Sequence, residues 1–423
     1  MQLLHPCCAG LDIHKKTVVA CVLLSREGGQ VERQLKSFGT TTAQLLELLE
    51  WLVGLGVTHA VMESTGVYWW PVYQLLEGHL HLTVANAAHV KALPGRKTDQ
   101  SDPEWLADLH RHGLVRGSFV PPRPQRELRE LTRHRLGLTA GRSRAFNQIE
   151  RTLEGTNLKL ASVVSTLSGV SARLMLAALA QGQSDPKALA ELAKGRLREK
   201  MAQLEAALQG SVRDYQRLII GQLLADIELL DEQIEAVSAM IAQRLEAQKE
   251  LIERLDLVPG VNRNIAEVYL AEVGTDTQRF GTAERAASWA GLCPGNNESG
   301  GKRLSGRSRK GDRALKVAMV QAGHAAGHCK HSYFGAQYRR LAGRRGKKRA
   351  ALAVGHALFK VCFHMIERGT PYQDLGANYF DQRQPEVIKR RLVKRLEKLG
   401  YRVTLAAAPP APQPPSQTLA QAA

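Results

Sequence analysis

The chain lacks the features that mark exported and membrane-spanning proteins. No apolar run among its 423 residues approaches the roughly 20 that a membrane-spanning helix needs, so we expect no membrane association. The start, MQLLHPCCAGLD, has neither the charged beginning nor the sustained apolar stretch of a secretory signal. These absences predict a cytoplasmic protein.

Cysteine and aromatic residues are also scarce. The six cysteines contain no CxxC pair and are too sparse for a disulfide framework or a zinc site. Aromatic residues make up 5% of the chain and hydrophobic residues 44%, which is ordinary for a helix-rich globular protein. Since single cores stop growing at about 250 to 300 residues, a chain of this length predicts two or three domains.

Acidic residues are too few to balance the basic ones. Asp and Glu number 40 against 58 Lys and Arg, which gives a formal net charge of +18. The excess is local, because residues 302–349 hold 15 basic residues and a single acid, Asp312. A merely soluble surface intersperses both signs, so this segment indicates a polyanionic partner. No amphipathic apolar face accompanies it, which favours nucleic acid over a membrane surface.

Residues 1–123 carry the pattern of an α/β domain. Three β-rich runs are followed by alternating helices and strands, and a helical stretch ends near Gly113. The earlier elements are expected, in order, at residues 9–14, 17–24, 31–39, 41–56, 59–64, 67–78 and 82–86. A three-strand meander before alternating strands and helices is the order of the ribonuclease H-like fold, although other α/β folds share that order.

The rest of the chain is predicted to be helical. Within residues 124–255, apolar positions from Leu208 to Leu245 step mostly by four and three, as in a coiled-coil seam. The seam fits either one amphipathic helix of its own domain or a dimerising arm, and we favour self-association as a dimer or tetramer. The remaining segments are a smaller, mostly helical domain at 256–376, a basic helix at 377–405 and a tail at 406–423 too poor in large apolar residues to fold.

Four carboxylates of the first domain are candidates for one metal site. Asp12 lies inside the first strand and Glu63 near the end of the strand at 59–64, while Asp99 and Asp102 open a helical stretch. Carboxylate oxygens suit Mg²⁺, and two Mg²⁺ ions can activate an attacking oxygen and stabilise a leaving one. Each carboxylate taken singly fits a structural role better, as a strand, turn or helix-cap residue. Their joint order favours the site.

The segment PGNNESGGKRLSGRSRKGDRALK, residues 294–316, is the second candidate site. Its glycines let backbone N–H groups approach phosphate oxygens, and its cations can shield the charge of a phosphate. A serine hydroxyl needs a base or metal to become a nucleophile, and the segment offers only Glu298. Spacing alone therefore favours a clamp on phosphate. Its candidate nucleic-acid-binding residues are Lys302, Arg303, Arg307, Arg309, Lys310 and Arg313.

Upstream, residues 255–274 resemble a helix-hairpin-helix. In such a motif a PGV turn presents backbone N–H groups and a helix N-terminus to phosphate, which adds affinity without sequence choice. The apolar residues of the segment, Leu255, Val258, Ile265 and Val268, fit a core role equally well.

Taken in order, these motifs resemble the DEDD-type transposases of the insertion-sequence one-ten class, also called bridge-RNA-guided recombinases. The resemblance covers the chain to about Tyr372, and each motif alone is weak while the whole order is specific. The matching motifs are GLDIHKK with Asp12, ESTGVYW with Glu63, KTDQSD with Asp99 and Asp102, PGVNRNIAEVYLAEVG, and WAGLCPGNNESGGKRLSGRSRKGDRALK with Ser299.

The resemblance implies a RuvC-like nuclease domain, a coiled-coil arm and a transposase domain with Ser299 as nucleophile. Asp12, Glu63, Asp99 and Asp102 would be catalytic and hold Mg²⁺. The implied enzyme cuts and rejoins the DNA of a mobile element at the bacterial nucleoid, and a guide RNA chooses donor and target DNA.

One residue departs from the family pattern. Pro103 follows Asp102 where the family usually has a good helix former, and proline biases the preceding residue away from helical dihedrals. If Pro103 is the first helical residue, Asp102 caps the helix and Asp99 lies in the preceding loop. Two other functions stay open: a metal-dependent junction nuclease whose basic loop only grips DNA, and a non-catalytic nucleic-acid-binding protein.

Overall fold

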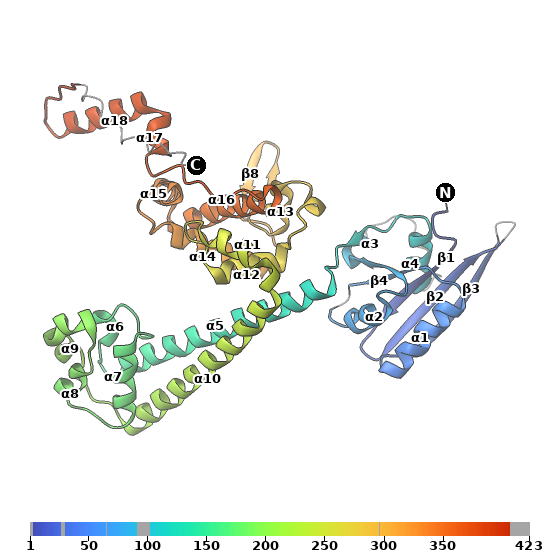
Figure 1. Ribbon diagram of the computed structural model, residues 1–423, viewed down its shortest axis with the longest axis horizontal. Helices are drawn as coiled ribbons and strands as arrows, with labels where there is room; N and C mark the ends of the chain where they lie inside the picture. Colours follow the sequence, from blue (N-terminus) through green and yellow to red (C-terminus); the bar gives the residue numbers. More distant parts are fainter. Residues whose placement is uncertain (1–2, 27–29, 65, 91–101, 296, 407–423) are drawn as a thin grey trace, which may run out of the picture. The chain divides into compact units, whose positions relative to one another are not determined.

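The chain folds as two compact units, Met1–Pro122 and Arg123–Ala423 (Figure 1). The computed structural model describes residues 3–26, 30–64, 66–90, 102–295 and 297–406. Asp99 lies outside the described residues, as does the tail from residue 407 onward.

The first unit is built on a mixed six-stranded sheet in the order β3-β2-β1-β4-β5-β6. Its strands are β1 (Cys7–Ile13), β2 (Thr17–Ser25), β3 (Val31–Gly39), β4 (His59–Glu63), β5 (His81–Ala85) and β6 (Gly117–Ser118). The first three form an antiparallel meander, β4 runs parallel to β1 and to β5, and β6 is antiparallel to β5. The expected α/β domain is confirmed. The sequence pattern missed β6, because two residues are too few to show alternation.

Helices cover both faces of this sheet (Figure 1). They are α1 (Thr42–Gly54), α2 (Trp69–Leu76), α3 (Ala87–Val90) and α4 (Asp102–Arg111). On one face, Ala9 and Leu11 of β1 share a core with apolar residues of α1 and α2. On the other, Cys8 and Gly10 lie against α4. Because successive strand residues face opposite sides, Asp12 belongs to the α4 face.

The helix α4 can lie directly on β1 because residue 10 has no side chain. A Cβ on Gly10 would stand 2.0 Å from the carbonyl oxygen of Pro103 and 2.6 Å from the backbone nitrogen of Ala107. One step earlier on the same face, the Sγ of Cys8 lies 3.5 Å from the carbonyl oxygen of Ala107. The contacts thus move toward the start of α4 as β1 advances, so Asp12 follows at the end of the strand nearest that start.

The second unit begins with a helical hairpin. Its long helices, α5 (Arg123–Gly155) and α10 (Asp214–Arg244), run antiparallel, with the ion pair Arg142–Asp231 near the middle of both and Arg244–Glu127 at one end. Shorter helices between them share a separate core with α5 and α10. These are α6 (Leu160–Val163), α7 (Val170–Ala180), α8 (Pro186–Glu191) and α9 (Met201–Ala207).

The apolar seam predicted from Leu208 to Leu245 is interrupted near its start. Leu208 caps the end of α9, and α10 begins only at Asp214. Farther along, Leu223 and Ile227 are buried in the core shared with α5 and α7. The chain therefore uses much of the seam for its own packing, and self-association stays a prediction.

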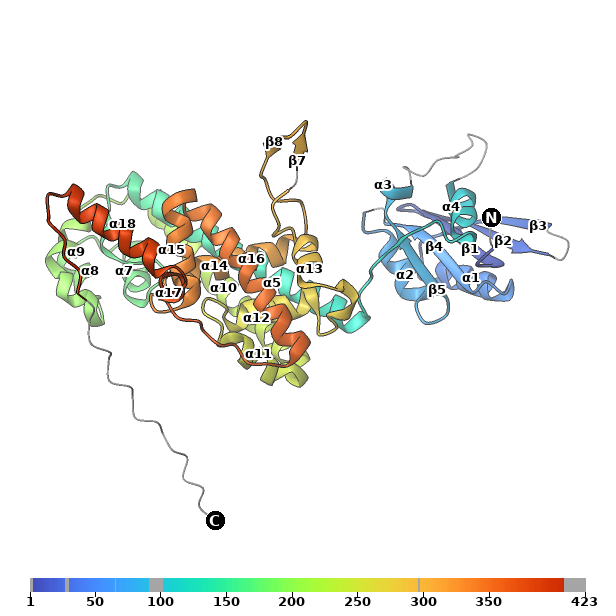
Figure 2. The ribbon, with the colours of Figure 1, turned by 90° about the horizontal axis from the view of Figure 1, so that it is seen from above.

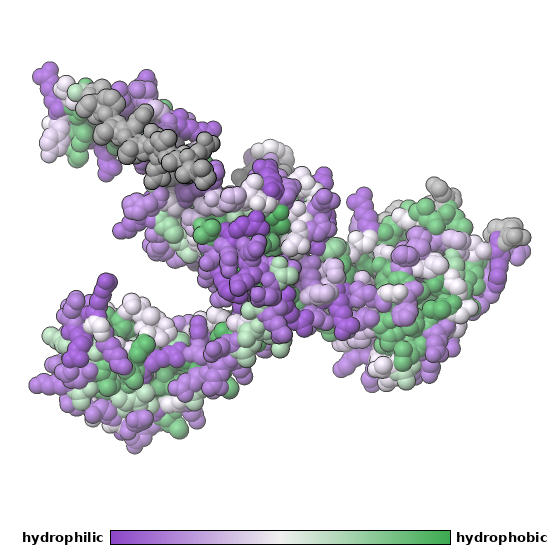
Figure 3. Space-filling model, viewed as in Figure 1, coloured by the Kyte–Doolittle hydropathy of each residue, from purple (hydrophilic) through white to green (hydrophobic). Residues whose placement is uncertain are grey.

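The rest of the second unit is a helical domain with a core of its own. Its helices are α11 (Lys249–Asp256), α12 (Arg263–Val273), α13 (Ala283–Trp289), α14 (Arg313–Ala326), α15 (Tyr333–Arg345) and α16 (Lys347–Arg368), followed by α17 (Tyr379–Arg383) and α18 (Pro385–Lys398). Hydrophilic residues, drawn in purple, cover much of the face of this domain that Figure 3 shows.

One helix corrects the expectation that no segment is long and apolar enough to cross a membrane. Within the described ranges α16 meets that test by length and composition. Half of its apolar window is buried, and Leu358, Phe359 and Phe363 are fully buried in the domain core. This is the burial expected of a core helix.

A side chain at position 10 should separate α4 from the sheet. We expect Gly10→Ala to lower the free energy of unfolding of the first unit by about 1–3 kcal/mol, the usual cost of overpacking. The control is Gly54→Ala at the end of α1, where a Cβ meets nothing within 4 Å and stability should hold or rise. Urea unfolding followed by tryptophan fluorescence measures both, because four of the five tryptophans lie in this unit. Equal stability of the two variants would contradict the close approach.

The first unit should also lose stability in mild acid. Four histidine rings lie against one another near the starts of β4 and β5, with ring centroids 3.9 Å apart for His5–His59, 4.8 Å for His5–His110 and 4.9 Å for His59–His81. Burial, helped by the charges of His5 and His59, lowers the pKa of His110 to about 4.

Acid destabilises the folded unit because His110 binds a proton more weakly in the folded chain than in the unfolded chain. The unfolded chain protonates this ring near pH 6.5 and the folded chain only near pH 4, so acid favours the unfolded state. We expect the free energy of unfolding to fall by about 3 kcal/mol between these pH values. His110→Gln should flatten this dependence, whereas His331→Gln in the second unit should not. If the free energy of unfolding of His110→Gln depended on pH as steeply as that of the unaltered protein, His110 would not be the cause of the acid sensitivity.

Candidate functional site

The strand register places two of the predicted carboxylates side by side. β1 and β4 are parallel, and Leu11 lies opposite Met62 in their pairing. The next residue on each strand is Asp12 and Glu63, so both stand at the same edge of the sheet and on the α4 face. The Asp12 carboxylate is 27% exposed, and its Oδ2 lies 3.1 Å from the Nε2 of His14.

A third predicted carboxylate belongs to the start of the helix on this face. Asp102 is the first residue of α4 and is exposed, and the buried Pro103 follows it as the second. Proline suits the first turn of a helix, where its missing N–H has no partner to lose. The departure at Pro103 is therefore compatible with α4 beginning at Asp102.

The donor chemistry of these side chains fits a hard divalent cation. Carboxylate oxygens are the ligands that Mg²⁺ prefers, and strand ends beside a helix start are exposed enough to admit an ion. Among the described residues, no three His, Cys, Asp or Glu side chains are close enough to hold a metal. Asp99, the fourth member of the predicted set, is outside those residues. The described carboxylates alone therefore do not form a metal site, and the Mg²⁺ site stays a prediction.

The predicted serine segment forms a β-hairpin that projects from the helical domain (Figure 2). Its strands are β7 (Asn297–Ser299) and β8 (Lys302–Ser305), and Gly300 and Gly301 join them with φ of 55° and 73°. Positive φ at both central residues is what a tight two-residue hairpin turn requires, and glycine adopts it without strain. Ser299 is thereby exposed beside the turn, opposite Lys302.

The three serines of this segment differ in whether their hydroxyl groups are hydrogen-bonded. The Oγ of Ser305 accepts a bond from the backbone N of Arg307 at 3.2 Å. The Oγ of Ser308 lies 2.7 Å from the Nζ of Lys316. Within the described part of the chain, the Ser299 hydroxyl has no hydrogen-bond partner. Two serines therefore stabilise the local fold, and Ser299 is the one available to a ligand.

The predicted cations lie on the strand after the turn and on the segment that returns to the domain. Arg303 is opposite Glu298 in the hairpin, and Arg307 follows β8, with its carbonyl oxygen accepting a bond from Gly295 N at 2.9 Å. Arg309 and Lys310 line a pocket, and Arg313 is the first residue of α14.

A buried ion-pair network holds the end of this cationic segment. Glu272 of α12 has a fully buried carboxylate, which lies 3.1 Å from Arg129 and 2.7 Å from Arg133, both of α5. Arg133 also reaches Asp312 at 2.8 Å, and Asp312 accepts the bond from Leu315 N that caps α14. The network thus connects α5, α12 and the start of α14.

Cys293, near the hairpin, is a weaker candidate nucleophile than Ser299. The Sγ of Cys293 lies 3.7 Å from the Nε2 of His356. Burial raises the pKa of the Cys293 thiol and lowers the pKa of His356, so both groups are neutral near pH 7. A neutral thiol beside a neutral imidazole lacks the thiolate that makes cysteine reactive.

Comparison with known families now bears on these two groups of residues. A model of the IS110-type DEDD transposases matches residues 9–158, and a model described as the IS116/IS110/IS902 transposase family matches residues 252–339. Together they cover more than half of the chain. The chain belongs to the IS110 family of transposases. The first match contains Asp12, Glu63 and Asp102, and the second contains Ser299.

Curated relatives agree with this family. A probable family 20 transposase of Pseudomonas aeruginosa is 28% identical over 36% of this chain and 47% of its own length. The insertion element IS900 42 kDa protein of Mycobacterium paratuberculosis is 30% identical over 52% of this chain and 58% of its own length. The insertion element IS110 43.6 kDa protein of Streptomyces coelicolor is 33% identical over 37% of this chain and 38% of its own length. The chain thus spans about half the length of the curated relatives it matches.

The helix-hairpin-helix-like segment of this family member is packed into the domain. α11 and α12 are two helices joined by a turn, and the apolar residues Leu255, Val258, Ile265 and Val268 all belong to the core. A Cβ on Gly260 in that turn would lie 2.3 Å from the carbonyl oxygen of Ala322 in α14. The core reading of these residues is therefore confirmed.

Sequence reasoning missed several residues that position the site. Gly10 stands out in the sequence only as part of a motif, and sequence patterns do not predict the Arg133–Glu272–Asp312 network. The available signal was the pair of arginines at 129 and 133, which stand four apart and so share one helix face. Nothing local indicates that their partner lies on α12.

Removing the buried carboxylate should destabilise the second unit. We expect Glu272→Ala to lower its free energy of unfolding by about 3 kcal/mol, because Arg129 loses its buried counter-charge. The control is Glu284→Ala, which breaks a surface pair with Lys360. The Glu284 carboxylate is 63% exposed, so its loss should cost much less stability. Urea unfolding followed by circular dichroism measures both. A smaller loss for Glu272→Ala than for Glu284→Ala would refute the role of the network.

Proposed function

We propose that this protein is a DNA transposase and site-specific recombinase that cuts and rejoins the DNA of a mobile element. Family membership supports the general reaction. The sheet order supports a ribonuclease H-like, RuvC-like nuclease domain, because its five main strands run 3-2-1-4-5 with a meander before the parallel strands. The adjacent Asp12 and Glu63 at one sheet edge are in keeping with a catalytic centre there.

Magnesium is part of the proposal. Asp12, Glu63 and Asp102 would hold it, with Asp99 as the fourth ligand named by the sequence. When bound, Mg²⁺ supplies positive charge that stabilises the attacking and leaving oxygens at phosphorus. His14, 3.1 Å from Asp12, orients that carboxylate by a hydrogen bond.

One observation supports Ser299 as the nucleophile: within the described residues its hydroxyl forms no hydrogen bond. Of the three serines in the segment, it alone is free of hydrogen bonds within the described residues, and it is exposed beside a glycine turn. Lys302 stands opposite it in the hairpin, where a cation can neutralise a phosphate oxygen. These features support Ser299 over Ser305 and Ser308.

In the proposed reaction the Oγ of Ser299 attacks a backbone phosphorus. An Oγ–phosphorus bond forms, the bond from phosphorus to the leaving strand's oxygen breaks, the hydroxyl proton passes to a carboxylate, and the leaving oxygen takes up a proton. An oxygen of the incoming strand then displaces Oγ, which regains its proton. The phosphoester bond is conserved, so rejoining needs no external energy.

The proposed partners are polyanions. The net charge of +18 and the cluster of cations after Ser299 favour DNA, and the family resemblance adds a guide RNA that chooses donor and target sites. Self-association as a dimer or tetramer also belongs to the proposal.

Replacing the nucleophile should abolish the covalent intermediate. The protein is incubated with Mg²⁺, labelled element-end DNA and RNA from the flanking non-coding region, and protein–DNA adducts are separated under denaturing conditions. We expect the adduct to vanish in Ser299→Ala, because alanine has no oxygen to join to phosphorus, and to persist in the matched control Ser305→Ala. Asp12→Asn should slow strand cleavage by about 100-fold or more.

Other outcomes would point to the rival functions. Normal cleavage by Ser299→Ala, together with its loss in Asp12→Asn, would indicate a metal-dependent junction nuclease with a basic DNA clamp. Nucleic-acid binding without cleavage, unaffected by Mg²⁺ removal or by Asp12→Asn, would indicate a binding protein.

A further inference from the structure

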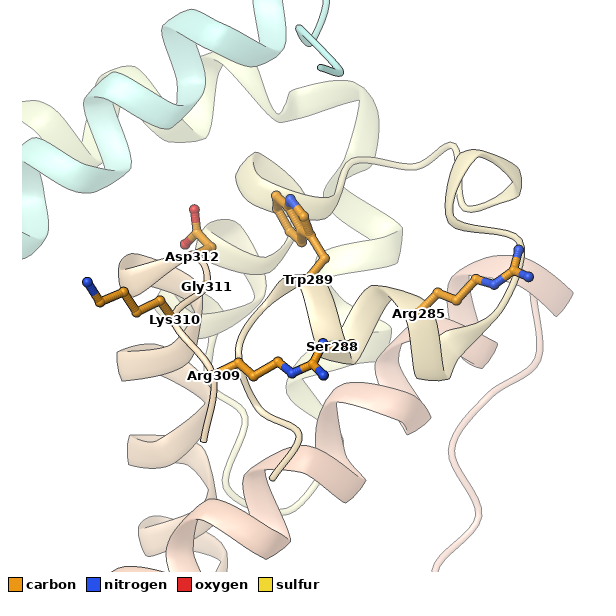
Figure 4. Close-up of a pocket in the computed structure, with 7 residues that line it drawn as sticks. All are labelled: Arg285, Ser288, Trp289, Arg309, Lys310, Gly311 and Asp312. Atoms are coloured by element: carbon orange, nitrogen blue, oxygen red, sulfur yellow. The ribbon is translucent and has the colours of Figure 1, made fainter. Parts of the chain in front are cut away.

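A pocket of about 570 Å³ lies at the root of the serine hairpin, and neither family membership nor the proposed reaction assigns it a role (Figure 4). One wall is α13 and the other is the segment that returns from β8 to α14. The residues that line it are Arg285, Ser288, Trp289, Arg309, Lys310, Gly311 and Asp312.

The aromatic wall of this pocket is a tryptophan with an open surface. Trp289 is 39% exposed, although so large an apolar ring is usually well buried. Its ring is supported by Phe280, with centroids 5.3 Å apart, and by the Arg129 guanidinium at 5.9 Å. Arg129 is itself fixed by Glu272. Trp289 is thus a braced ring that lines the pocket and keeps part of its surface exposed.

The polar wall carries positive charge that the chain does not neutralise. Within the described ranges, Arg285, Arg309 and Lys310 form no side-chain ion pair or hydrogen bond. Asp312 is the one acid in the lining, and its carboxylate already accepts bonds from Arg133 and from the backbone of α14. Figure 4 shows Arg309 reaching toward Ser288 of α13, Arg285 extending from α13 toward the other side, and Lys310 pointing away from the helix on the segment that leads to Asp312.

We propose that this pocket binds an unpaired nucleotide, whose base stacks on Trp289 while its phosphates lie against Arg285, Arg309 and Lys310. Aromatic rings beside free cations are the elements by which proteins hold single-stranded nucleic acid. Bases in a duplex stack on one another and cannot offer a face to the ring. The inference deepens the proposed function and rests on it for the source of the strand: a single strand exposed beside the phosphodiester that Ser299 attacks.

Binding of short oligonucleotides tests this assignment. The full chain is titrated without Mg²⁺ with fluorescently labelled oligo-dT, oligo-rU and a DNA duplex of matched length. We expect Trp289→Ala to weaken single-strand binding by about 10-fold or more, as for loss of one stacked base, and to leave duplex binding unchanged. Trp289→Phe should retain most of the affinity. The matched control is Tyr215→Ala on α10, an aromatic residue that is 57% exposed.

A second variant covers the case in which Trp289→Ala fails to fold. Arg285→Gln should lower the salt dependence of single-strand binding by about 0.7 in the slope of log affinity against log salt, since one phosphate contact is lost. Arg196→Gln, an exposed arginine elsewhere in the unit, should leave that slope unchanged.

Comparison of oligo-dT with oligo-rU identifies the strand. If the variants lose affinity for only one of the two oligonucleotides, the result supports the pocket and identifies its ligand as DNA or RNA. Unchanged single-strand binding in both Trp289→Ala and Arg285→Gln would overturn the assignment, as would equal losses for duplex and single strand. The readout needs no strand transfer and can be repeated in Ser299→Ala, so failure of the catalytic proposal and failure of this one are distinguishable.

Discussion

The buried carboxylate of Glu272 is the interaction on which the second unit depends most. A carboxylate removed from water is costly unless it is paired, and Glu272 has two guanidinium partners on α5. Arg133 pairs with both Glu272 and Asp312. One side chain therefore fixes the position of α12 and the first turn of α14. The cationic segment ends at that turn. The C-terminal end of the segment is therefore held in place, and Asp312, which adjoins its cations, is already paired with Arg133.

Much of the fold follows from local patterns. Short β-rich runs, with alternation at residues 31–39, predict the five longer strands of the first unit, and the helix expected at residues 41–56 is α1, which packs on them. The patterns fail where the deciding contact is distant. A break between α9 and α10 interrupts an apolar spacing that looks continuous, and β6 exists only because β5 offers it an edge.

The candidate site was predictable in its residue types and not in its arrangement. That Asp12 and Glu63 share an edge depends on the parallel register of β1 and β4, which the sequence implies only once the fold is assumed. The choice among three serines depends on which hydroxyls are already bonded, a property of the folded hairpin. The position of Asp102 depends on how near α4 can come to β1, and a single absent side chain sets that distance.

Two kinds of glycine in this chain impose different limits on sequence drift. At position 10 the obstacle is neighbouring backbone, so every other amino acid is too large, however well it tolerates the strand conformation. At the tip of the serine hairpin a Cβ at position 300 meets nothing within 4 Å, and the obstacle is only the left-handed backbone. Asparagine and aspartate accept that conformation at modest cost. The hairpin tip can therefore accept a change of residue, while the strand beneath α4 has no such freedom.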